Sequence, residues 1–290
     1  MRLVSFVEPL EPSVVRTGVV LDGEVVDLTD PSVGLPGDMT DFLEAGPAAM
    51  ERAAAAAATG ARRLALDALR LRPPVPHPVK VLGIGLNYAE HVAETGASRP
   101  EHQVWFNKQR TCVIGPGEAI EIPRVSPQVD YEGELALVIG RRCRHVRAED
   151  AASVVAGFTV LNDVTVRDWQ WRTPTWTLGK SFDTHGPTGP WIVTGDEVGD
   201  PHRLRLRTWV NGDLRQDAST DDMIFSCWEQ VEYLSTVFTL EPGDILSTGT
   251  PAGVGIGFDP PRWLVDGDVV RIDIERIGTL ENPVAVEPDS

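Results

Sequence analysis

Short apolar runs separated by glycine, proline and asparagine fill most of this chain and predict a β-rich protein. Residues 14–20 and 24–28 flank Asp22-Gly23, a pair typical of a type I′ hairpin turn. Asn211-Gly212 predicts a second turn between residues 203–210 and 214–216. Further short strands are expected at 81–85, 245–248 and 268–274.

Helical periodicity is confined to two regions. Residues 39 to about 71 follow a helical pattern that is interrupted at Gly46-Pro47 and Gly60, and the alanine run 53–58 favours a helix. Residues 222–238 predict the clearest helix, because apolar side chains recur there at helical spacing.

Four prolines within residues 73–78 predict a domain boundary, since neither a helix nor a central strand accommodates them. We therefore expect a small N-terminal α+β domain at 1–72, a proline-rich linker at 73–79 and a main domain at 80–290. The fold class is a β-rich α+β protein whose main body is a mixed β-sandwich or roll with helices outside.

Composition narrows the choice of partners. The 290 residues carry 26 Lys+Arg and 43 Asp+Glu, a formal net charge of −17, which argues against a nucleic acid or an anionic membrane surface. Cys112, Cys143 and Cys227 are odd in number and widely spaced, as expected of reduced thiols in a cytoplasmic protein. No apolar run approaches the ~20 residues that a membrane span needs.

Residues 129–139 predict a strand with two carboxylates on one face. Period two places Glu132 and Glu134 beside Ala136 and Val138, while the opposite face is also apolar. Two carboxylates on one face of a buried strand require a cation to offset repulsion and lost hydration. A strand end that reaches solvent is the alternative, and it needs no cation.

A third carboxylate ends the next apolar run, at Asp163. A helix is expected to open there, with Asn162 or Asp163 near its N-cap, so that Asp163, Arg167 and Gln170 share one face. This stripe suits a metal ligand beside two groups that grip an anion, although a capped surface helix gives the same pattern. Oxygen ligands alone favour Mg²⁺, Mn²⁺ or Ca²⁺ over zinc. Lys180 is a candidate second cation of the pocket, or a surface lysine.

A candidate base precedes these residues. After the glycine turn at 83–85, His91 and Glu94 stand three positions apart on a predicted short helix, where the carboxylate can orient the imidazole and raise its basicity. An exposed, solvated pair is the alternative. Gly83 and Gly85 form only a weak nucleotide fingerprint, because the third glycine is absent.

Together, these segments resemble the fumarylacetoacetate hydrolase family over residues 80–280. The resemblance lies in Gly85-Leu86-Asn87-Tyr88, Asp130-Tyr131-Glu132-Gly133-Glu134, Asn162-Asp163-Val164-Thr165-Val166-Arg167-Asp168, Gly179-Lys180-Ser181-Phe182-Asp183 and Ser247-Thr248-Gly249-Thr250-Pro251. Residues 1–72 resemble the smaller, variable N-terminal region of bacterial members.

The resemblance implies a mixed β-roll catalytic domain, a homodimer and bound Mg²⁺ or Mn²⁺, with Ca²⁺ as a substitute in a crystal. Its metal carboxylates fall on Glu132, Glu134 and Asp163. Its substrate-gripping positions fall on Arg167, Gln170, Lys180 and Thr250. In the acylpyruvase and oxaloacetate-decarboxylase branch, a His–Glu pair on a lid helix falls on His91 and Glu94.

The implied function is hydrolysis of the C–C bond of a 2,4-dioxo acid of the acylpyruvate or fumarylpyruvate type, through a metal-stabilised pyruvate enolate. Decarboxylation of oxaloacetate or isomerisation of a hydroxymuconate-like diacid on the same site is the alternative, and a non-catalytic metal- or ligand-binding member is the second. Trp169, Trp171 and Trp176 are expected to pack in the core or an interface, or to wall the pocket. His185 is expected to be structural, with a place in the pocket as the alternative.

Overall fold

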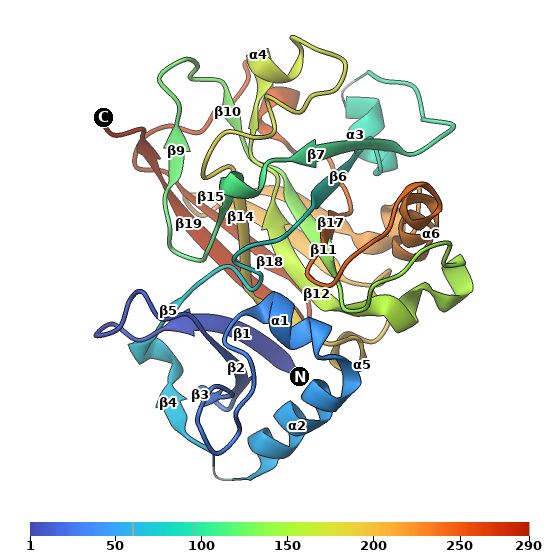
Figure 1. The fold of residues 1–290 in the computed structure, drawn as a ribbon. Helices are drawn as coiled ribbons and strands as arrows, with labels where there is room; N and C mark the ends of the chain where they lie inside the picture. The colour runs from blue at the N-terminus through green and yellow to red at the C-terminus, as the bar shows by residue number, and fades with distance from the viewer. Residues whose placement is uncertain (60, 95, 290) are drawn as a thin grey trace.

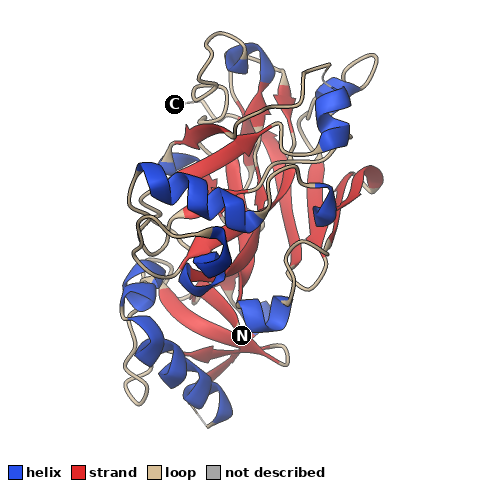
Figure 2. Ribbon diagram, turned by 90° about the vertical axis from the view of Figure 1, so that its right-hand side faces the viewer, coloured by secondary structure: helices blue, strands red, loops and turns tan. Residues whose placement is uncertain are grey.

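Two large β-sheets form the body of the protein in the computed structural model, which describes residues 1–59, 61–94 and 96–289 (Figures 1 and 2). The larger sheet runs in the order β4-β3-β2-β1-β14-β12-β11-β17-β6-β7, with β5 paired to β1 and β8 to β14. Its strands are β1 (Arg2–Val7), β2 (Arg16–Leu21), β3 (Glu24–Asp27), β4 (Arg63–Ala65), β5 (Arg70–Leu71), β6 (Val81–Gly85), β7 (Val104–Lys108), β8 (Val113–Ile114), β11 (Gly133–Ile139), β12 (Val155–Asn162), β14 (Gly186–Val193) and β17 (Ile245–Ser247).

The smaller sheet runs β16-β15-β18-β19-β9, and a separate pair joins β10 to β13. These strands are β9 (Ile120–Ile122), β10 (Val129–Asp130), β13 (Thr165–Val166), β15 (Arg205–Val210), β16 (Asp213–Ser219), β18 (Val269–Ile274) and β19 (Gly278–Val286). The helices are α1 (Met39–Glu44), α2 (Gly46–Ala58), α3 (Ala89–Glu94), α4 (Arg167–Gln170), α5 (Gly195–Val198) and α6 (Cys227–Val237). In the residues that the structure describes, no helix is long and apolar enough to cross a bilayer. The predicted β-rich α+β class is confirmed.

Strand β11 is buried on both faces, as the sequence predicts. Leu135 and Leu137 face a core that also contains apolar residues of the smaller sheet and α6. Ala136 and Val138 face a second core, which α1 and α2 cover. Side chains of the carboxyl-bearing strand are therefore shielded from water wherever they point.

The N-terminal residues share the larger sheet and its second core with the rest of the chain, although they form a distinct lobe in Figure 1. Strand β1 pairs with β14, and Phe42 of α1 belongs to the same cluster as Val138 and Ile245. The predicted boundaries at 1–72, 73–79 and 80–290 remain predictions.

A substitution in this shared core tests how independent residues 1–72 are. Phe42→Ala should destabilise the protein by about 3–5 kcal/mol, because it leaves a cavity where a fully buried ring packs. Urea unfolding followed by tryptophan fluorescence and by far-ultraviolet circular dichroism should show one coincident, shifted transition. The exposed Leu10→Ala is the control and should change little. A separate early transition would show that residues 1–72 unfold alone.

The turn predictions are confirmed, while one helix prediction is wrong in part. Asp22 and Gly23 (φ 51° and 80°) close the β2–β3 hairpin, and Asn211 and Gly212 (φ 52° and 85°) close β15–β16. The helical pattern holds to residue 58, but residues 63–71 add short strands to β3 and β1 instead. Free edges of the sheet outweigh helix propensity there. Residue 60 lies outside the described residues.

Candidate active site

Three carboxylates meet at the end of β11. Glu134 lies on β11, and Glu132 precedes that strand. Asp163 follows β12 and is drawn beside Glu132 by the antiparallel register, in which its backbone amide donates to the Glu132 carbonyl (2.8 Å). Carboxylate oxygens of the three residues lie within 4.8 Å of one another, and all three side chains are buried. The structure thus brings together the three acids that the sequence proposes as ligands.

This donor set fits a hard divalent cation. It offers oxygen ligands alone, as Mg²⁺, Mn²⁺ and Ca²⁺ prefer. Burial, with the neighbouring Asp163 and Glu132 carboxylates, raises the pKa of Glu134 well above its usual value. A divalent cation on the triad would remove that penalty, so the charge distribution as well as the geometry suits a metal.

Two cations accompany the triad on the side that faces the pocket. The Lys180 ammonium lies 2.6 Å from Glu132 Oε2 and 2.7 Å from Asp163 Oδ2, and Arg167 Nη2 lies 2.7 Å from Glu132 Oε1. Burial alone would raise the pKa of Glu132. The positive charges of Lys180 and Arg167 outweigh burial and hold the pKa of this carboxyl at about 2. Glu132 is therefore ionised at neutral pH, ready to bind a cation.

Sequence reasoning missed two charged residues of the site. Lys108, at the end of β7, is buried and donates to Asp163 Oδ1 (2.7 Å). Asp130 is also buried, and its Oδ2 accepts from Arg167 Nε (2.8 Å). The Asp130 signal was present, because this carboxylate opens the motif that contains Glu132 and Glu134. An isolated lysine such as Lys108 gives no comparable signal, since most lysines are exposed.

The predicted N-cap at Asn162 or Asp163 is wrong. Helix α4 begins only at Arg167, after Val166, and Asn162 ends β12. Asn162 Oδ1 instead accepts from the Glu132 amide (3.0 Å), so its side chain fixes the backbone that carries Glu132. Arg167 and Gln170 nevertheless lie together, with Nη1 donating to Oε1 (3.0 Å).

A pocket of about 330 Å³ opens over Glu132 and Glu134. Residues predicted for substrate and proton transfer line it: His91, Glu94, Arg167, Gln170, Lys180 and Thr250. His91 Nδ1 lies 3.3 Å from Glu94 Oε2, so the predicted pair forms on α3, in the same pocket as Glu132 and Glu134. The Thr250 hydroxyl donates to the Gly133 carbonyl (3.0 Å), so its proton serves the fold. The individual roles remain predictions.

The tryptophans of the loop divide between the two expected locations. Trp171 and Trp176 line the pocket, and Trp176 packs edge-on to Phe106 with the ring centroids 6.0 Å apart. Trp169 packs edge-on to Phe182 outside the pocket lining (5.5 Å). The pocket thus has an aromatic wall beside its charged floor.

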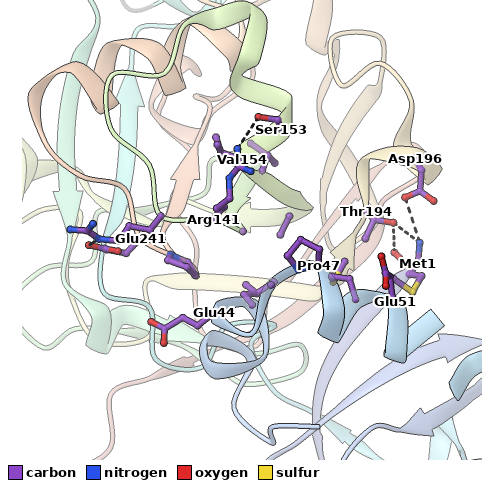
Figure 3. A pocket seen from close by; sticks show the side chains of 18 residues that line it. Met1, Glu44, Pro47, Glu51, Arg141, Ser153, Val154, Thr194, Asp196 and Glu241 are labelled. Carbon is purple, nitrogen blue, oxygen red and sulfur yellow. Dashed lines mark hydrogen bonds and ion pairs between the residues drawn. The ribbon is translucent and has the colours of Figure 1, made fainter. Parts of the chain in front are cut away.

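A larger cleft of about 710 Å³ lies between α1–α2 and the main sheet (Figure 3). Two of its arginines have partners: Arg142 Nε lies 3.1 Å from Glu241 Oε1, and Arg141 Nη2 donates to Ser153 Oγ (3.4 Å). Within residues 1–59, 61–94 and 96–289, only the triad groups three acidic, histidine or cysteine side chains closely enough to share a metal. We therefore assign the chemistry to the smaller pocket.

His185 is buried away from the triad and should govern acid stability. Burial lowers the pKa of His185 to about 3, and its Nε2 lies 2.8 Å from the Glu121 carbonyl oxygen. Because the folded imidazole stays neutral while the unfolded one protonates below about 6.5, stability is lost as pH falls from there toward 3.

His185→Gln keeps a donor for that carbonyl and should remove up to about 1.4 kcal/mol of stability loss per pH unit in this window. Urea unfolding at several pH values between 4.5 and 6.5 measures the slope. The exposed His77→Gln is the control. Equal slopes in wild type and His185→Gln would show that His185 is protonated in the folded protein.

A known protein family matches most of the chain. The family model described as "Fumarylacetoacetate (FAA) hydrolase C-terminal" matches residues 80–285. The chain is 41% identical over 288 residues to the mitochondrial oxaloacetate tautomerase fahd2 of Xenopus laevis, covering 98% of this chain and 90% of that protein.

Two solved structures are also similar. A maleylpyruvate hydrolase from Sphingobium sp. SYK-6, in complex with manganese(II) and pyruvate, is 34% identical with a TM-score of 0.83, covering 99% of this chain and all of that one. A 2-hydroxyhepta-2,4-diene-1,7-dioate isomerase from Mycobacterium marinum is 36% identical with a TM-score of 0.78, covering 100% of both chains.

Proposed function

Because the chain belongs to the fumarylacetoacetate hydrolase family, we propose that it is a divalent-metal-dependent enzyme that converts a small 2-oxo acid through its enolate. The observation that carries this proposal is one pocket lined by two sets of groups. Glu132, Glu134 and Asp163 form a buried oxygen site, and the His91–Glu94 pair lines the same pocket. A metal site and a proton-transfer pair are the two components that enolisation requires.

Each residue has a task that its position supports. A divalent cation on the triad would stabilise negative charge that develops on the 2-oxo oxygen. The Lys180 ammonium adds positive charge at the same end of the pocket, and Arg167 and Gln170 hold the substrate carboxylate. Glu94 orients the His91 imidazole so that it can take a proton from carbon 3 or return one.

Tautomerisation of oxaloacetate is the reaction we favour. His91 removes a proton from carbon 3 of the keto form, and a proton is added to the 2-oxo oxygen to give the enol, with no bond to carbon broken other than C–H. The likeness to an oxaloacetate tautomerase over nearly the whole of both chains supports this choice over the hydrolysis predicted from the sequence. Decarboxylation of oxaloacetate would instead break the C3–C4 bond, releasing CO₂ and leaving the enolate of pyruvate, which is then protonated at carbon 3.

Hydrolysis of a 2,4-dioxo acid is the second candidate. His91 would instead take a proton from water, which attacks carbon 4; the C3–C4 bond then breaks and carbon 3 is protonated, giving pyruvate and a second acid. The aromatic wall of Trp171 and Trp176 supports this reading, because it offers apolar surface to a substituent beyond carbon 4. The similarity to a maleylpyruvate hydrolase supports it too.

A substrate panel separates the candidates. Purified protein is assayed with Mg²⁺, with Mn²⁺ and with a chelator on oxaloacetate, acetylpyruvate, fumarylpyruvate and maleylpyruvate. Enol–keto exchange of oxaloacetate is followed by ultraviolet absorbance, and C–C cleavage by released pyruvate. We expect metal-dependent exchange as the fastest reaction. Faster pyruvate release would favour the hydrolase, and metal binding without turnover would favour a binding protein.

The predicted homodimer and cytoplasmic location remain predictions. Several relatives at about 40–42% identity carry the word mitochondrial in their names. Sedimentation of the purified protein would test the dimer.

A further inference from the structure

One loop, residues 247–257, forms hydrogen bonds both to the carboxylate triad and to the His91–Glu94 pair. At its start, Ser247 Oγ (2.5 Å) and the Gly249 amide (2.8 Å) donate to Glu134 Oε2. Further along, the Gly253 amide donates to Glu94 Oε1 (2.9 Å). The loop therefore fixes a carboxylate of the triad and the carboxylate that orients His91.

Asp130 holds the far end of this loop. Its Oδ1 accepts from the Gly255 amide (2.6 Å), and its Oδ2 accepts from the Ile256 amide (3.0 Å). Oδ2 also accepts from Arg167 Nε (2.8 Å). Because Asp130 is fully buried, these bonds are not weakened by competing water, and removing the charge would release the loop and Arg167.

The loop also packs directly on Glu94. A methyl group on Gly257 would lie 2.3 Å from Glu94 Oε1 and 2.5 Å from its Cδ, so only glycine fits there without moving that carboxylate. Gly257 is not in the left-handed region, so alanine would strain the contact with Glu94 and not the backbone. This gives a way to displace Glu94 from the loop side.

We propose that Asp130 is a positioning residue: it holds residues 253–257 against Glu94 and thereby fixes the His91–Glu94 pair in the pocket that Glu132 and Glu134 line. The catalytic consequence rests on the proposed function of that pair. The structural consequence is that Asp130 stabilises the position of α3 through the loop. This consequence does not depend on the proposed function.

A double-mutant cycle tests the catalytic consequence. Asp130→Asn should lower kcat about 10–100-fold, as removal of residues that orient catalytic groups commonly does. In a Glu94→Ala background the same change should lower kcat by a clearly smaller factor, because the route through Glu94 is gone, whereas a rise in KM from the released Arg167 should persist in both backgrounds. Asp268→Asn is the matched control: Asp268 also holds a turn amide (Val265, 2.9 Å) and should leave kcat unchanged. Equal loss of kcat in both backgrounds would overturn the proposal.

Gly257→Ala tests the same contact between the loop and Glu94, and it can be used if Asp130→Asn folds poorly. It should lower kcat without raising KM, since it displaces Glu94 and leaves Arg167 in place, and its effect should vanish with Glu94→Ala. Gly195→Ala is the control, because a methyl group there meets nothing within 4 Å. Unchanged kcat in Gly257→Ala would contradict the link.

Hydrogen–deuterium exchange of the metal-free protein tests the structural consequence without any turnover. Asp130→Asn should raise exchange in residues 253–257 and also in 89–94, while Asp268→Asn should raise it in neither. Unchanged exchange at 89–94 would overturn the inference. If exchange rises as expected but the wild type turns over no substrate, the link stands and the proposed function fails.

Discussion

Glu134→Gln should abolish metal-dependent turnover and at the same time make the metal-free protein more stable. The glutamine oxygen can accept from Ser247 Oγ and the Gly249 amide as the carboxylate does, and its amide group would face the other two acids as a donor. The substitution removes one of three oxygen ligands, so we expect turnover to fall by roughly 10³-fold or more, since a bound metal is worth several kcal/mol to such a transition state.

The gain in stability follows from the sign of the pKa shift. Burial and the adjacent Asp163 and Glu132 carboxylates raise the pKa of Glu134, so the folded, metal-free protein binds this proton more tightly than the unfolded chain. That stabilisation is complete below the unfolded pKa and is lost as pH rises through the folded one. Above the unfolded pKa, the unfolded chain ionises this carboxyl more readily than the folded protein does, and glutamine removes that cost to the folded state.

Thermal unfolding of the metal-free proteins between pH 5 and 8 measures this effect. Wild type should lose stability with rising pH more steeply than Glu134→Gln, and Mn²⁺ should raise the Tm of wild type alone. Glu118→Gln is the contrasting control, because Glu118 pairs with Arg72 (2.6 Å) far from the pocket; it should lower Tm and leave turnover intact. A similar fall in Tm for Glu134→Gln would show that the Glu134 carboxyl does not destabilise the folded, metal-free protein.

Local pattern was sufficient to predict which three carboxylates meet, because two of them stand two positions apart and the third follows the neighbouring strand. Alternation along residues 129–139 places Glu132 and Glu134 near each other in any extended conformation, and Asp163 is the next carboxylate after the strand that pairs with β11. The same local pattern predicted the wrong start of the helix, at the point where the chain leaves the larger sheet. Val166 and Thr165 pair with β10, which delays the helix to Arg167 and moves Asp163 off it.

The rest of the site depends on contacts between distant segments, which no local pattern reveals. Lys108 reaches Asp163 only because β7 borders β6 at the end of the larger sheet. Asp130 acquires its partners from residues 255 and 256, more than a hundred positions later. In the sequence, Lys108 looks like an ordinary surface charge and Asp130 is marked only by its place in the motif, so burial is what identifies both as part of the site.

His91→Ala should separate proton transfer from metal binding. We expect kcat to fall about 10²–10⁴-fold, the usual contribution of a positioned acid–base group. Affinity for Mn²⁺, measured by titration calorimetry, should stay within about twofold, because the three carboxylates that form the oxygen site are untouched. Added imidazole should restore part of the lost turnover, since the truncated side chain leaves space in the pocket for it. The exposed His102→Ala is the control and should behave as wild type.

The same variant distinguishes three possible roles of His91: metal ligand, base that activates water, and base that moves the proton at carbon 3. Lost Mn²⁺ affinity would place the imidazole among the ligands, and unchanged turnover of every substrate would remove it from the reaction. Loss of pyruvate release with enol–keto exchange preserved would mean that His91 activates water and that another group moves the proton at carbon 3. If His91 is the only base, enol–keto exchange and pyruvate release should both be lost while the affinity for Mn²⁺ stays intact. In that case His91 moves the proton and takes no part in binding the metal.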